Sequence, residues 1–141
     1  MRKLRYLLLL PFLAGLPACL SLQSDEQKAE AAEKAVLARH DELMAQMDQL
    51  TTLRQQLTRS PGPDTVAAAR HRRALLAADA AMLDWMHRYR QPADSVAVAR
   101  RLGYFADQQK KIDSVAGLFR TSLDSARLVV QTAGKPTSSA P

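Results

Sequence analysis

Residues 60 to 63 read Ser60-Pro61-Gly62-Pro63, and this stretch separates two helical patterns. Proline cannot continue the backbone hydrogen-bond ladder of a helix, and it biases the preceding residue toward extended conformations. Apolar residues recur at helical spacing before the stretch, at Val36, Leu37, Leu43, Met44, Met47, Leu50, Leu53 and Leu57. Together with a capping box at Ser24-Asp25-Glu26-Gln27, the pattern predicts a helix over 25–59.

Two further helices are predicted after this stretch. Asp64 is a suitable N-cap for a helix over 64–90, with buried positions at Leu75, Ala78, Met82, Trp85, Met86 and Tyr89. Gln91-Pro92-Ala93 ends it, and a near-heptad series then predicts a helix over 94–132. Its apolar positions are Val98, Leu102, Phe105, Ile112, Ala116, Phe119, Leu123, Ala126 and Val130. The tail over 133–141 has little to bury, and we expect it to be disordered.

Two short turns force neighbouring helices to run antiparallel, so we predict an all-α, coiled-coil-like, up-down-up three-helix bundle over 25–132. The composition agrees, because apolar residues make up 47% of the chain while aromatic residues make up only 5%. Centring the two turns near residues 61 and 92 places Val36 beside Val98 and Leu57 beside Phe119.

This register leaves the end of the third helix without a partner. About 12 residues, or about 18 Å of helix, extend beyond the second helix. An uncovered apolar stripe usually marks a contact surface, so we predict docking on a second copy or on another envelope protein. The alternatives are a third helix that bends over the first turn, or one that frays after Leu123. The residues of the stripe are Leu123, Ala126, Leu128, Val129 and Val130.

The first 24 residues resemble a bacterial lipoprotein signal followed by a tether. Basic residues near the start precede an apolar run over 6–16, and Leu16-Pro17-Ala18-Cys19 matches the pattern in which the cysteine is diacylated after cleavage. We predict a signal peptide over 1–18, lipidation of Cys19 and a tether over 19–24. The alternative is an uncleaved anchor helix, but the run is interrupted by proline and falls short of the roughly 20 residues that span a bilayer. Leu20, in place of aspartate, favours the outer membrane of the cell envelope.

One group of side chains could bind a metal ion. His40, Met44 and Met47 lie on the first predicted helix and face Met82 and Met86 on the second. Imidazole and thioether ligands suit Cu(I), and facing helices are where bundles build metal sites. The favoured interpretation is that the methionines fill the core while His40 bonds to a neighbour such as Asp79. We therefore predict no cofactor.

The sequence contains no Gly-x-Ser-x-Gly, phosphate-loop or His-Glu-x-x-His motif, so we do not expect an enzyme. Without the three basic residues of the predicted signal, the formal charge of +6 falls to +3. Basic pairs occur at Arg72-Arg73, Arg100-Arg101 and Lys110-Lys111, but neighbouring side chains diverge on a helix and stacking aromatics are missing. We interpret them as solvated and expect no nucleic-acid partner, with lipid headgroups or a protein as the next alternatives.

Three segments resemble a family of small helical lipoproteins of Bacteroidota that is often labelled "viral A-type inclusion protein". They are His40-Asp41-Glu42-Leu43-Met44, the stretch Ala78 to His87 with its Asp-Trp-Met-His piece, and Tyr104-Phe105 through Lys110-Lys111-Ile112. The resemblance implies a helical fold and an envelope location, and it implies no activity. We therefore predict a membrane-anchored, non-enzymatic structural or protein-interaction bundle; the alternative is a copper-binding or copper-sensing bundle.

Overall fold

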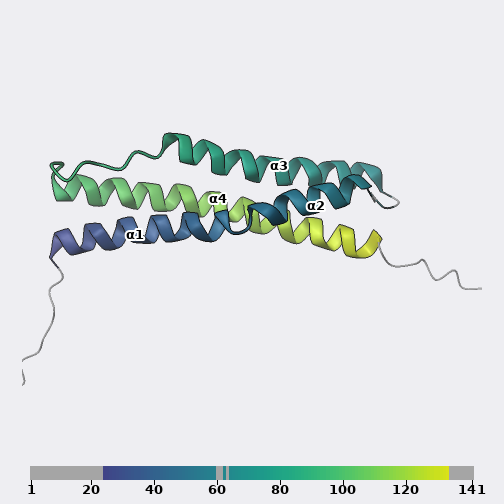
Figure 1. Cartoon of the computed structure of the whole chain (residues 1–141), viewed down its shortest axis with the longest axis horizontal. Coiled ribbons are helices and arrows are strands. Elements are labelled where there is room, and N and C mark those ends of the chain that lie inside the picture. Colours follow the sequence, from purple (N-terminus) through teal and green to yellow (C-terminus); the bar gives the residue numbers. More distant parts are fainter. Residues whose placement is uncertain (1–23, 60–61, 63, 134–141) are drawn as a thin grey trace, which may run out of the picture.

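The structure is a computed structural model that describes residues 24–59, 62 and 64–133, and these residues form helices joined by turns, without strands. The helices are α1 (Asp25–Met44), α2 (Met47–Arg59), α3 (Thr65–Arg88) and α4 (Val98–Ala133). α1 and α2 follow one another as a single bent rod, α3 returns beside α2, and α4 runs the whole length of the bundle (Figure 1). α4 packs on all three other helices. The predicted all-α three-helix bundle is therefore confirmed, with the first helix bent.

The predicted helix starts at Ser24 and Asp64 are present. The Ser24 hydroxyl accepts from the Gln27 backbone N–H at 3.2 Å, and the Gln27 side chain accepts from the Ser24 N–H at 3.0 Å. The Asp64 carboxylate accepts from the Ala67 N–H at 2.8 Å and so caps α3. Gly62 has φ +73°, a conformation that favours glycine, in the turn between α2 and α3.

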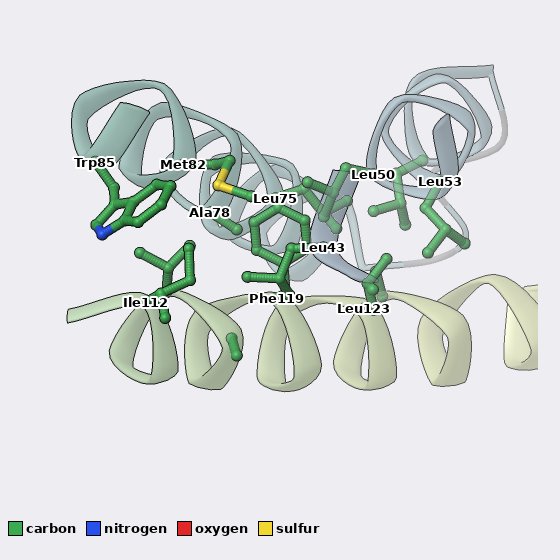
Figure 2. Packing of buried hydrophobic residues seen from close by; sticks show 14 of the residues in the cluster. Leu43, Leu50, Leu53, Leu75, Ala78, Met82, Trp85, Ile112, Phe119 and Leu123 are labelled. Carbon is green, nitrogen blue, oxygen red and sulfur yellow. The ribbon is translucent and has the colours of Figure 1, made fainter. Parts of the chain in front are cut away.

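The core consists of apolar residues that recur every seven positions. On α4 these are Phe105, Ile112, Phe119 and Ala126, all fully buried. Figure 2 shows Ile112 and Phe119 beneath the side chains that α3 contributes. Burying each large side chain contributes about 1.5–3 kcal/mol, so the heptad seam supplies most of the cohesion.

The first predicted helix is interrupted at Ala45 and Gln46. The Gln46 N–H bonds to the Leu43 carbonyl at 2.9 Å, a tightened turn, and its side-chain amide donates to the Glu42 carbonyl at 3.1 Å. The most deeply buried residues of this predicted helix lie seven apart, at Ala29, Val36, Leu43, Leu50 and Leu57. An ideal helix drifts by about 20° per seven residues, hence about 80° over this series. The break absorbs the drift, and α2 packs on both α3 and α4 whereas α1 packs chiefly on α4.

The connection between α3 and α4 is longer than predicted. It covers nine residues, 89 to 97, and α4 begins at Val98 and not at Asp94. Tyr89 leaves α3 with an extended backbone, and the Arg90 N–H donates to the Tyr104 hydroxyl at 2.8 Å. The chain then turns back through a bond from the Val96 N–H to the Ala93 carbonyl at 2.9 Å. The first turns of α4 therefore extend past the end of α3.

The longer connection changes the register of α4, so the predicted register is wrong. Glu26 pairs with Arg101 at 2.5 Å, and Arg39 pairs with Asp113 at 3.2 Å. α1 and α4 run parallel, and residues that contact each other across them lie about 75 positions apart in the sequence. The predicted register instead placed Val36 beside Val98, 62 positions away. The last residue of α4 consequently reaches the α2–α3 turn, where a Cβ built on Gly62 would lie 3.1 Å from that of Ala133.

Candidate functional site

The residues predicted to bind a partner are covered by the chain's own core. Leu123 is 2% exposed and Ala126 is fully buried, while Val129 and Val130 are half-buried against the core cluster. Figure 2 shows Leu123 directed from α4 toward the helices that pack on it. The prediction that these residues form an uncovered stripe is wrong, because the shift in register brings α2 over them. Leu128 alone remains largely exposed, at 64%.

The proposed copper ligands have unequal surroundings. Met82 is fully buried and Met47 packs partly against the core, whereas Met44 is 40% and Met86 37% exposed. The His40 Nδ1 lies 3.0 Å from the Asp41 carboxylate, on the neighbouring residue and not on the suggested Asp79. Asp79 instead pairs with Arg54 at 3.7 Å.

The His40 ring belongs to a row of neighbouring, mutually tilted rings that runs from the second half of α1, past the end of α3, to the first turns of α4. Ring centroids are 5.7 Å apart from His40 to Trp85, 5.0 Å from Trp85 to Tyr89 and 6.0 Å from Tyr89 to Tyr104; Phe105 follows at 5.6 Å. Such offset and tilted ring pairs each contribute about 0.5–1.5 kcal/mol beyond the area they bury. The row thus joins α1, α3, the connection and α4.

Two polar atoms inside this aromatic row have no hydrogen-bond partner among the described residues. They are the Trp85 Nε1 and the Tyr89 hydroxyl. Burial raises the pKa of the Tyr89 phenol, and the negative charge of Glu33 acts in the same direction, because both disfavour the phenolate. The row is thus a packed apolar junction that keeps its phenol neutral.

A shallow groove of about 370 Å³ runs between α3 and α4. Trp85 and Val115 line it together with the buried side chain of Gln108 and the exposed Leu118. The charged residues at its edge form ion pairs with neighbours on the same helix, Arg88 with Asp84 at 3.0 Å and Lys111 with Asp107 at 2.7 Å. The sequence reasoning missed the groove; Gln108 could have revealed it, since it lies seven residues after Arg101 and seven before Val115 in the buried heptad series.

Cys19, the predicted lipidation site, lies outside the described residues, as do the predicted signal over 1–18 and most of the predicted tether and tail. Among the described helices, none combines the length and apolar character needed to cross a membrane. The described residues also contain no group of three or more His, Cys, Asp or Glu side chains able to hold a metal ion.

Comparison of the chain with protein-family models, with curated proteins and with solved structures gives no match. The resemblance to small helical lipoproteins therefore stays a prediction.

Proposed function

We propose that the chain is a lipid-anchored, non-enzymatic rod of the cell envelope that acts as a structural or protein-interaction module. The anchor is a diacylated Cys19, and the outer membrane is the proposed location because Leu20 follows the cysteine. Several acyl chains on one residue give stable membrane attachment, whereas a single chain gives only marginal binding.

The observation that carries this proposal is the shape of the bundle. α1 begins six residues after Cys19, and its first turn lies at one end of the rod (Figure 1). The α2–α3 turn lies at the other end. α4 spans 36 residues, which corresponds to about 54 Å at 1.5 Å per residue. A chain held at Cys19 would therefore carry its far end several nanometres from the anchor.

The charged side chains also support a rod and not a catalyst. Many form ion pairs with a neighbour three or four residues away, such as Lys28 with Asp25 at 2.8 Å and Lys111 with Asp107 at 2.7 Å. Such solvent-exposed pairs stabilise a helix only modestly.

Metabolic labelling with radioactive palmitate tests the anchor. We expect label on the parent chain and on Ser21→Ala, a control variant two residues away, and none on Cys19→Ser. Fractionation of the same cells should find the parent in the outer membrane, and Cys19→Ser either as uncleaved precursor or in the soluble fraction. Label that persists on Cys19→Ser would refute the proposed acyl acceptor.

A further inference from the structure

Four arginines surround the end of the rod that lies far from Cys19. Arg59 is in the last turn of α2, and Arg70, Arg72 and Arg73 are in the first turns of α3. We call them the hairpin arginines. The Arg72 guanidinium donates to the Thr58 hydroxyl at 3.3 Å across the two helices, which brings the α2 and α3 members of the group together. The other three arginines are exposed.

No hairpin arginine has a carboxylate partner among the described residues, whereas many other basic residues of the rod are paired. In the sequence, the neighbouring residues Ser60, Pro61 and Pro63 are uncharged types. Asp64 is the one acidic residue between Arg59 and Arg73, and its carboxylate caps α3. Four arginines and one aspartate give this hairpin a formal charge of +3.

Apolar side chains accompany these charges. Val66 is 76% exposed, and it precedes Arg70 by four residues and Arg73 by seven, so all three share one face of α3. Leu76 is also exposed on α3. A helix face that combines basic residues with exposed apolar ones is typical of binding at a lipid–water interface. Stacking on single-stranded nucleic acid relies on aromatic side chains, and residues 47 to 84 contain no Phe, Tyr or Trp.

We propose that the α2–α3 hairpin binds the surface of a membrane that contains anionic phospholipids. Guanidinium groups bind phosphate oxygens through paired hydrogen bonds, and Val66 would enter the headgroup layer. The binding itself follows from the charge and exposure of the hairpin. The further consequence, that the rod links its anchoring membrane to a second lipid surface, rests on the proposed lipid anchor.

The test uses the intact, lipidated chain reconstituted into vesicles of phosphatidylcholine alone. Flotation of the chain with these neutral vesicles reports on the anchor. Fluorescent, protein-free vesicles are then added, either of phosphatidylcholine or of phosphatidylcholine mixed with phosphatidylglycerol, and their capture is measured at low and high salt. We expect capture of the anionic vesicles only, and its loss at high salt because the ionic attraction is screened. Capture of neutral vesicles to the same extent, or no capture of either kind, overturns the proposal.

Matched variants separate the hairpin from net charge. Each basic residue near an anionic surface increases binding about fivefold, so Arg70→Gln with Arg73→Gln should weaken capture about 25-fold. Arg100→Gln with Lys110→Gln removes the same charge from exposed sites outside the hairpin and should leave capture unchanged. Equal losses in the two double variants overturn the proposal. If the chain fails to float with neutral vesicles, the anchor is refuted, and the same variants are compared by mixing the chain directly with anionic vesicles.

Discussion

Leu123 and Leu128 are five residues apart on α4, and their replacement by alanine tests the register of the whole bundle. Leu123 is 2% exposed within the core, whereas Leu128 is 64% exposed. The substitution removes three carbon atoms, worth about 0.8 kcal/mol each when buried, or about 2.4 kcal/mol in total. The cavity left behind raises the cost of Leu123→Ala to about 3–5 kcal/mol, while Leu128→Ala should stay within about 0.5 kcal/mol.

Thermal unfolding and urea titration, both followed by circular dichroism, measure this difference. For a folded region of about 110 residues, 3 kcal/mol corresponds to a fall in Tm of about 12 °C. Leu128→Ala is the internal control, because it deletes the same atoms from the same helix. A register in which the end of α4 has no partner would expose both leucines. Similar small losses in both variants would therefore refute the packing described above.

Three further predictions concern the row of rings and the methionines. Tyr104→Phe removes the acceptor for the Arg90 N–H, so it should cost about 1 kcal/mol and accelerate hydrogen exchange at that amide; unchanged exchange would contradict the contact. Burial raises the pKa of Tyr89 in the folded chain, so this residue's contribution to the free energy of unfolding should be fully present below pH 10. The free energy of unfolding should fall as the pH rises above the ordinary pKa of tyrosine, and Tyr89→Phe should lessen that fall. A slope equal to that of the parent would contradict this origin. In Cu(I) titration of the intact chain we expect no binding at micromolar concentration, since Met82 is enclosed and His40 pairs with Asp41; binding that both His40→Ala and Met44→Leu abolish would contradict this expectation.

Local chemistry made the starts of α1 and α3 predictable. The capping box at Ser24 and the N-cap at Asp64 are determined by neighbouring residues, and both are present. The break at Ala45 and Gln46 was not predicted, because neither proline nor glycine occurs there. The break arises because residues that repeat every seven positions rotate gradually around an ideal helix and so away from α4. This cause lies in the packing between helices and not in the local sequence.

The start of α4 shows why the candidate partner surface was misplaced. Asp94 is a good N-cap by residue type, but the chain there forms a turn between Ala93 and Val96. A difference of a few residues in the connection then moved the whole of α4 by more than three helical turns relative to α1. Leu123 and Ala126 became core residues as a result. The hairpin arginines can be read from the sequence. Only the three-dimensional arrangement shows that they have no carboxylate partner among the described residues.

The separation of about 75 positions between partners on α1 and α4 has a consequence for the order of folding. The α2–α3 hairpin joins segments close in sequence, so it can form early, whereas closing the α1–α4 pair requires a much longer loop. As the chain is synthesised from its N-terminus, α1 emerges first, yet its partner residues on α4 emerge only after the whole of α2 and α3. α1 buries only Ala29, Val36 and Leu43, so it exposes little apolar surface while it waits. The helix that must remain unpaired longest is thus the one least prone to aggregate during that interval.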